Sequence, residues 1–190
     1  MGGHIKKVSG IIIILLLLTY GCTKKEENKI SEKPEEEIKH FTLKQFADNK
    51  GGGFVLEGES AEISSGGASM TTPQLSFSTG TESIEITTGK EGSGEIKIDP
   101  DEKKVKTIII TGNIKIVYRD LKTKDITMEG SCKKLTYNEI EKTIIMEVSP
   151  VIKRGNNYFS GDVMYYNLEK NSLDIKGNVN AQIYTEKGTH

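Results

Sequence analysis

The sequence predicts an all-β fold, and three observations support this prediction. From residue 104 onward, short runs of alternating apolar and polar residues recur, each about as long as a strand. Gly-Asn pairs and short charged segments separate these runs and supply the conformations that tight turns need. Nowhere does the apolar period of a helix persist for more than two turns. The hydrophobic content of 35% and the absence of Trp suit thin sheets with one solvated face.

The N-terminus predicts a secretion signal. The basic pair Lys6-Lys7 precedes an unbroken run of eight aliphatic residues, Ile11 to Leu18. A spanning helix needs about 20 apolar residues, so this run fits the core of a cleaved signal peptide better. The run leads into Gly21-Cys22, and a small residue followed by Cys resembles a bacterial lipoprotein cleavage site. We therefore expect lipidation of Cys22, and the alternative is a plain signal peptide with an incidental cysteine.

Cysteine count and charge exclude several kinds of protein. If Cys22 carries lipid, only Cys132 remains, so no internal disulfide can form, and Cys132 is predicted to be a small buried residue of a strand. Without the two lysines of the leader, 24 basic residues face 27 acidic ones, a formal charge of −3. Neither a basic stripe for nucleic acid nor an acidic block for metal ions is present, and we expect no cofactor.

The chain divides into four predicted segments. Residues 1–21 form the signal peptide, 22–40 a lipidated tether, 41–186 the β domain and 187–190 a tail. The tether is charged, nearly free of apolar residues and interrupted by Pro34. Such a segment cannot bury enough surface to offset its ordering entropy, so we expect a flexible spacer, with a short helix over 35–39 as the alternative.

The first half of the β domain is predicted to hold several strands. Phe41 to Phe46 and Phe54 to Ile63 each alternate around a glycine-rich turn, and Pro73 interrupts the next run, 68–78. Short alternating runs follow at 84–86 and 96–98. The glycines between them, from Gly89 to Gly94, predict a hairpin loop. A phosphate-binding loop is disfavoured, because the required strand and helix do not flank these glycines.

The second half has a stronger pattern. Two segments share a Gly-Asn pair between alternating runs: Thr111-Gly112-Asn113-Ile114 and Lys176-Gly177-Asn178-Val179. Two others end in Tyr-Asn, at Tyr137-Asn138 and Tyr166-Asn167. Such repetition suggests stacked strands. The predicted strands are 104–111, 113–119, 124–129, 132–138, 142–148, 150–154, 157–166, 171–176 and 178–185.

Alternation assigns the apolar residues of these strands to one face and the polar residues to the other. Two sheets would then close their apolar faces on each other. We expect an apolar groove between the sheets that could hold acyl chains. Its predicted lining is Phe54, Leu56, Ile108, Ile110, Ile114, Ile116, Ile144, Met146, Leu173, Ile175, Val179 and Ile183.

These motifs resemble those of a known family. Phe54-x-Leu56-x-Gly58-x-x-Ala61 is similar to the early strand of LptC, and the Gly-Asn and Tyr-Asn units of residues 105–184 resemble OstA-like repeats of LptA. The resemblance identifies a periplasmic lipopolysaccharide-transport protein, LptC-like or LptA-like, and covers about residues 41–185. It implies a twisted antiparallel β-jellyroll, open along one side as a V-shaped two-sheet roll, after a cleaved lipoprotein signal.

The resemblance also implies partners and a location. A member of this family receives lipopolysaccharide or a related glycolipid from an inner-membrane ABC transporter complex. It passes the lipid to other Lpt jellyroll proteins by edge-strand stacking, here through the predicted strands 41–47 and 178–185. We expect a periplasmic protein without enzymatic activity. Cys22 would anchor it through lipid to a membrane, with the inner membrane preferred over the outer one.

Two other functions compete with this expectation. A surface or periplasmic lipoprotein with β-repeats, acting as an adhesive or structural module, would have a closed core and take no lipid. A hydrolase is disfavoured, because the histidines, His4, His40 and His190, all lie outside the strongly alternating region and no Gly-x-Ser-x-Gly motif is present. An open groove would favour lipid carriage, and a sealed core would favour the structural module.

Overall fold

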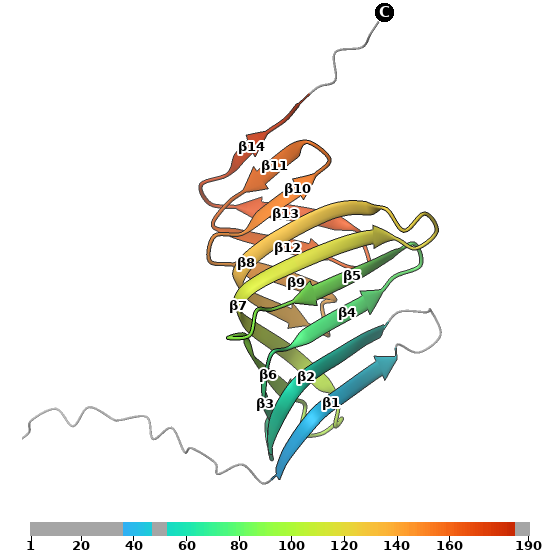
Figure 1. The fold of residues 1–190 in the computed structure, drawn as a ribbon, viewed down its shortest axis with the longest axis vertical. Coiled ribbons are helices and arrows are strands. Elements are labelled where there is room, and N and C mark those ends of the chain that lie inside the picture. The colour runs from blue at the N-terminus through green and yellow to red at the C-terminus, as the bar shows by residue number, and fades with distance from the viewer. Residues whose placement is uncertain (1–35, 47–52, 185–190) are drawn as a thin grey trace, which may run out of the picture. The chain divides into compact units, whose positions relative to one another are not determined.

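The computed structural model describes residues 36–46 and 53–184, and every regular element in these ranges is a β-strand (Figure 1). All pairings are antiparallel, as the alternating sequence predicts. The strands are β1 (Glu36–Phe46), β2 (Gly53–Ser64), β3 (Gly67–Thr71), β4 (Gln74–Ser78), β5 (Glu82–Thr87), β6 (Ser93–Ile98), β7 (Val105–Asp120), β8 (Ile126–Asn138), β9 (Thr143–Glu147), β10 (Val151–Arg154), β11 (Asn157–Ser160), β12 (Val163–Asn167), β13 (Ser172–Lys176) and β14 (Asn180–Gln182).

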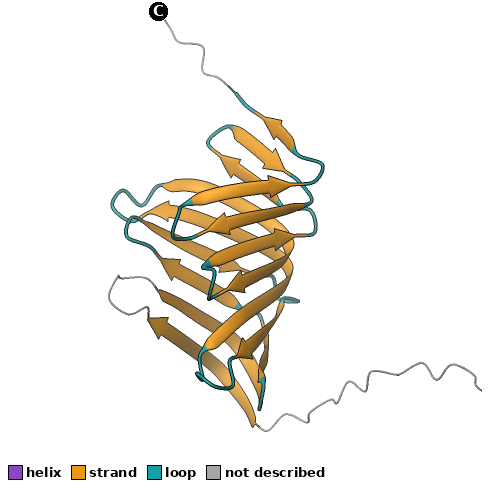
Figure 2. Cartoon of the chain, turned by 180° about the vertical axis from the view of Figure 1, so that it is seen from behind, coloured by secondary structure: helices purple, strands orange, loops and turns teal. Residues whose placement is uncertain are grey.

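The long strands pass from one layer of the fold to a second layer (Figures 1 and 2). β2 pairs with β4 through residues 53–57 and with β3 through residues 60–64. β7 pairs with β6 through its first half and with β5 through its second half, along the same edge. β8 likewise pairs with β9 and with β10. The first layer therefore contains β4, β5, β10, β11 and β14, and the second contains β3, β6, β9, β12 and β13.

We call the line along which chains cross between the layers the vertex. Backbone conformations with positive φ occur there at His40, Thr72, Gly112, Val148, Ser149, Gly177 and Asn178. Gly112 has a φ of +127°, a conformation that essentially only glycine adopts, and a Cβ there would lie 3.0 Å from the Gly92 Cα. The bend between the layers thus depends on residues that leave the ordinary strand conformation.

The two Gly-Asn repeats both lie at this vertex but act differently. The predicted break at Gly112-Asn113 is wrong, because β7 continues through it with a shift in register between Thr111 and Ile114. This irregularity resembles a β-bulge, which bends a strand without ending it. At Gly177-Asn178, in contrast, β13 has ended and β14 has not begun. The repeat therefore marks the crossing between layers, whether or not the strand is interrupted.

A second repeat forms the turns on the side opposite the vertex, which we call the open side. Four residues begin these turns, and each side-chain Oδ1 accepts a backbone N–H bond two or three residues onward: Asp99, Asp120, Asn138 and Asn167. The residue four positions later has positive φ in every case: Lys103, Lys124, Lys142 and Asn171. Backbone N–H donors lower the pKa of Asp99 and of Asp120. Such Asx turns explain why the Tyr-Asn motifs occur at strand ends.

Several strand boundaries differ from those predicted. β1 begins at Glu36, inside the segment predicted as tether, because its first residues pair with β2. β8 continues through Gly130, whereas the predicted strand 157–166 breaks at Gly161-Asp162 into β11 and β12. The last strand covers only Asn180–Gln182 of the predicted 178–185. The expected break at Pro73 is confirmed, since it lies between β3 and β4.

The sequence predicted a hairpin loop between β5 and β6, and this prediction is wrong. The glycine-rich segment instead crosses between the layers at the vertex. β5 pairs with β4 and β7, whereas β6 pairs with β3 and β7. The two strands therefore follow one another along β7 in different layers. Local sequence could not reveal this, because a hairpin and a crossing use the same turn residues.

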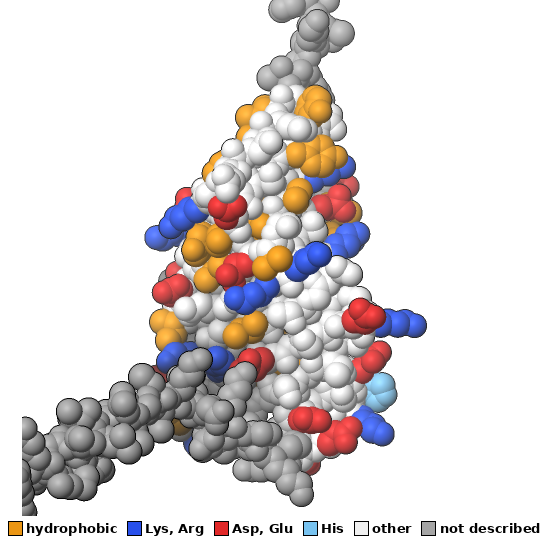
Figure 3. All heavy atoms as spheres, turned by 90° about the vertical axis from the view of Figure 1, so that its left-hand side faces the viewer, with side chains coloured by type: hydrophobic (Ala, Val, Ile, Leu, Met, Phe, Trp, Pro, Cys, Tyr) orange, Lys and Arg blue, Asp and Glu red, His pale blue; other side chains and the backbone are white. Residues whose placement is uncertain are grey.

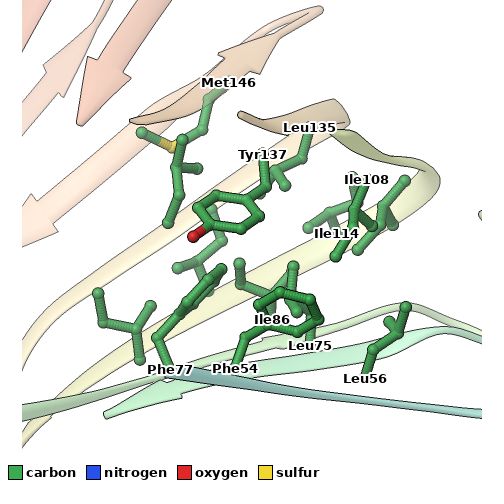
Figure 4. Packing of buried hydrophobic residues seen from close by; sticks show 14 of the residues in the cluster. Phe54, Leu56, Leu75, Phe77, Ile86, Ile108, Ile114, Leu135, Tyr137 and Met146 are labelled. Atoms are coloured by element: carbon green, nitrogen blue, oxygen red, sulfur yellow. The ribbon is translucent and has the colours of Figure 1, made fainter. Parts of the chain in front are cut away.

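Apolar side chains from both layers form one core. Phe54, Phe77 and Tyr137 meet edge to face, with ring centroids 4.7 to 6.4 Å apart (Figure 4). Ile108, Ile110 and Leu135 are completely buried nearby. The predicted inward direction of Ile144 and Met146 is confirmed, but Val148, assigned to the same face, is 52% exposed. Val148 has positive φ at the vertex, where the strand alternation ends.

The predicted signal peptide and Cys22 lie outside the described residues, as does most of the tether. Among residues 36–46 and 53–184, there is no helix of sufficient length and hydrophobicity to cross a membrane. Seen from the side in Figure 3, the outer surface mixes both signs of charge with scattered apolar side chains. A near-neutral formal charge of −1 for the whole chain agrees with this mixture.

Candidate functional site

Two adjoining cavities lie between the layers on the open side. The larger, of about 580 Å³, is bordered by the β4–β5 turn of the first layer and the β8–β9 and β12–β13 turns of the second. The smaller, of about 390 Å³, lies between β8, β10 and β11 on one side and β12 and β13 on the other. Both are lined by Glu82, Tyr166 and Asn171, so we treat them as one feature, the open-side cleft.

Polar side chains and five apolar ones together line the smaller cavity of the cleft. Met128, Ile152 and Phe159 line it from the first layer, and Leu173 and Ile175 line it from β13. Ile152 is buried, whereas the other four are only partly buried and pack against the core. The cleft is thus the place where the apolar interior becomes accessible. This arrangement suits a ligand with hydrocarbon chains.

Polar side chains form the rim. The Tyr137 hydroxyl donates to Glu139 at 2.5 Å, and Glu139 also pairs with Lys142. The Tyr166 hydroxyl donates to Asn171 Oδ1 at 2.6 Å, and Thr127 donates to Glu82 at 3.1 Å.

Both tyrosines remain protonated at neutral pH. Burial and the nearby Glu139 raise the pKa of Tyr137, and burial together with Glu82 raises that of Tyr166 to about 12. The cleft therefore combines an apolar wall with a hydrogen-bonding rim.

The structure divides the predicted groove residues into three groups. Leu173 and Ile175 line the cleft. Val179 and Ile183 are 58% and 66% exposed, near the short last strand. The remaining eight are at most 3% exposed and belong to the closed core: Phe54, Leu56, Ile108, Ile110, Ile114, Ile116, Ile144 and Met146. The expected inward direction is confirmed for the third group, but none of these eight side chains lines the open-side cleft.

The predicted set lacked most residues that line the cleft, including the four apolar or aromatic residues Met128, Ile152, Phe159 and Tyr166 of the smaller cavity. Tyr166 could have been found, because it belongs to a Tyr-Asn motif whose Asn begins an open-side turn. Met128 and Ile152 come from β8 and β10, whose pairing brings them to one wall. That pairing is not local in sequence, so alternation alone could not place them beside Leu173.

The thiol of Cys132 is buried and stays protonated. It lies in β8 and is 4% exposed, as predicted for a small buried strand residue. Burial raises its pKa to about 12, so the thiol stays protonated at neutral pH. No group of three His, Cys, Asp or Glu side chains in the described part of the chain could hold a metal ion.

Free strand edges lie at both ends of the described sheet. β1 pairs only with β2, whereas β13 pairs only with β12 and β14 only with β11, within the described residues. β1 is 11 residues long, and its exposed end carries Phe46, which is 78% exposed. Such edges can accept another strand.

Comparisons with known proteins agree with this architecture. Residues 52–172 match the family described as LptA/(LptD N-terminal domain) LPS transport protein. A search of curated protein sequences finds no significant match.

The fold is similar to the crystal structure of LptH from Pseudomonas aeruginosa, described as the LptA homologous periplasmic component of the conserved lipopolysaccharide transport device. The two are 13% identical with a TM-score of 0.54, over 70% of this chain and 95% of that chain. This likeness shows a shared fold, the LptA-like antiparallel β-jellyroll. Because the family match covers more than half of the 190 residues, the chain belongs to the LptA/LptD N-terminal domain family of LPS transport proteins.

Proposed function

We propose that this chain is a membrane-tethered carrier that binds the acyl chains of lipopolysaccharide or a related glycolipid and forms part of a transport bridge across the periplasm. The open-side cleft is the observation that carries this proposal. Its apolar walls at Leu173 and Ile175 fit acyl chains, and its polar rim fits a sugar headgroup. Family membership supports lipopolysaccharide as the cargo.

The cleft also indicates where lipid would bind. Acyl chains would enter between β13 of the second layer and β8, β10 and β11 of the first. The eight fully buried residues of the predicted groove would support the walls and touch lipid only if the layers separate.

The free edges would join this domain to its neighbours. We propose that β1 pairs with a jellyroll or with the inner-membrane ABC transporter complex, and that β13 and β14 pair with the next jellyroll. Strand addition of this kind uses backbone hydrogen bonds for affinity. The exposed apolar side chains near β14, Val179 and Ile183, would be covered by such a partner.

Photo-crosslinking in living cells tests cargo and neighbours together. A photoreactive residue at Ile175 is expected to capture lipopolysaccharide, because this side chain lines the cleft. The same residue at Asp174, which is exposed on the opposite face of β13, is the matched control and should capture none. At Thr42, exposed on β1, it should capture a protein partner.

The outcomes also separate the proposal from its competitor. The closed core of eight predicted groove residues favours a structural or adhesive lipoprotein, in which no position would reach lipid. Equal lipid capture at Ile175 and Asp174, or capture at neither, would contradict lipid carriage. Absence of protein capture at Thr42 alone would contradict only the use of β1 as a joining edge.

We further propose that lipid on Cys22 anchors the protein, with the inner membrane as the preferred location. The motif Gly21-Cys22 after a short aliphatic run supports this anchor. Each buried CH₂ contributes about 0.8 kcal/mol, so two or three acyl chains suffice for stable attachment.

Replacing Cys22 with serine is expected to move the protein from the membrane fraction to the soluble fraction or to block its processing. Mass spectrometry of the mature wild-type N-terminus gives the direct check. An unmodified Cys22 would refute the anchor and leave the cleft proposal standing.

A further inference from the structure

Tyr118 in β7 carries a buried hydroxyl group without a hydrogen-bond partner among the described residues. Its side chain is 1% exposed and points inward from the first layer, between Ile84 of β5 and Met128 of β8. It is the only buried side-chain nitrogen or oxygen atom of the described chain in this condition. Native proteins bond the large majority of such atoms, so each exception asks for an explanation.

Packing alone does not explain why a tyrosine occupies this position. The Tyr118 ring meets the Tyr166 ring edge to face, with centroids 5.1 Å apart, and a phenylalanine ring could make the same contact. The hydroxyl adds only the cost of removing a polar group from water. The Tyr118 hydroxyl is therefore energetically unfavourable where it lies, and it makes no hydrogen bond that would offset this cost.

The surroundings of Tyr118 place its hydroxyl behind the wall of the open-side cleft. Tyr166, Met128 and Glu82 all line the smaller cavity. Tyr166 is in ring contact with Tyr118, Met128 is its neighbour in register, and the charge of Glu82 acts on it. Tyr118 itself does not line the cavity. Tyr166 and Met128 therefore lie between Tyr118 and the cavity, and their displacement is the route by which the hydroxyl would meet a ligand.

The polar side chains nearest to Tyr118 do not bond to its hydroxyl group. The Tyr166 hydroxyl donates to Asn171, and Glu82 accepts from Thr127. Burial, followed by the charges around it, raises the pKa of Tyr118 well above its ordinary value, so its proton is retained. Tyr118 is thus a permanent donor for which the protein supplies no acceptor among the described residues.

We propose that the Tyr118 hydroxyl donates a hydrogen bond to an oxygen atom on the apolar part of the bound lipid. The acceptor is the carbonyl oxygen of an ester- or amide-linked acyl chain, or a hydroxyl oxygen on that chain. Tyr118 then makes the cleft select oxygen-bearing acyl chains over plain alkyl chains. This inference rests on the proposed function, since it specifies the class of lipid that the same cleft accepts.

The test compares the full mature chain with its Tyr118→Phe variant, using two probes. Lipid A carries ester, amide and hydroxyl oxygens on its chains, and a dialkyl ether glycolipid of similar chain length carries neither carbonyl nor hydroxyl oxygens there. The variant is expected to bind lipid A about three- to tenfold more weakly, the range of one hydrogen bond. Affinity for the ether glycolipid should stay unchanged.

The melting temperature of the lipid-free protein is a second measurement. If Tyr118 had a purely structural role, its replacement by phenylalanine would lower that temperature. Without lipid, Tyr118→Phe should melt at the same temperature as the wild type or higher, because the buried unbonded hydroxyl is removed. Tyr165→Phe removes the hydroxyl of a β12 tyrosine that does not line the cleft, and it is the matched control for both measurements. It should leave the affinity for lipid A unchanged.

The remaining outcomes show whether the inference alone fails or the proposed function fails with it. Equal affinity of wild type and Tyr118→Phe for lipid A overturns the inference while the proposed function stands. A lower melting temperature of the lipid-free variant also overturns it, because the hydroxyl would then be bonded within the folded protein. A wild type that binds neither probe contradicts the proposed function itself, and the inference with it.

Discussion

Replacing Ile110 with alanine is expected to lower the free energy of unfolding by about 2–5 kcal/mol, the range for truncating a large aliphatic side chain in a core. Ile110 is completely buried, with Gly94 and Leu135 in register on either side. Because Ile110 lines neither cavity of the open-side cleft, the affinity for lipid should be unchanged. Urea denaturation and lipid titration of the same preparation measure the two effects.

Ile175→Ala is the matched variant, because Ile175 lies in the same inward row of the second layer. The row runs from Ile110 through Leu135, Met146 and Met164 to Ile175. Ile175 is only partly buried and lines the cleft, so its truncation should cost less stability and weaken lipid binding. A small loss of stability for Ile110→Ala together with weaker lipid binding would show that the lipid site extends to β7.

Replacing Leu173 with aspartate is expected to weaken lipid binding at least about tenfold, because an acyl chain would strip water from the new carboxylate. Leu173 lines the smaller cavity from β13 and is partly buried, so water can still solvate the carboxylate when the cleft is empty. The loss of folding stability should therefore be smaller than for Ile110→Ala. Titration with lipid A and thermal unfolding check the two parts.

Asp174→Asn is the control for this change, since Asp174 is the exposed neighbour on the opposite face of β13. It alters charge on the same strand without touching the cleft, and lipid affinity should be unchanged. If Leu173→Asp bound lipid A as tightly as the wild type while remaining folded, acyl chains would not contact this wall. The proposed location of the cargo would then be wrong.

The turns show how far local sequence can be interpreted. Asp120 begins an open-side turn because its short carboxylate accepts two nearby backbone N–H bonds, and this chemistry is contained in a few consecutive residues. The segment around Gly112 shows what local sequence cannot predict. A Gly-Asn pair favours positive φ, but whether the strand then ends or bends depends on the strands beside it, and β6 and β8 continue the pairing of β7.

The C-terminal residues show the same limit for burial. Val179 and Ile183 have the alternation of an inward face, yet both are exposed. Burial requires a facing layer, and β14 pairs only with β11 at the end of the first layer among the described strands. Alternation specifies which side chains share a face of a strand, and it says nothing about whether another layer covers that face.

The all-β class, the apolar face of each strong strand and the positions of most turns can be predicted from local sequence, because these depend on residues within a few positions of one another. Which apolar residues form the closed core and which line the cleft depends on the three-dimensional packing. Ile110 and Ile175 have the same local pattern, and they differ because strands of the first layer cover one fully and the other in part. That cover comes from pairings between residues far apart in the chain, which no local period can encode.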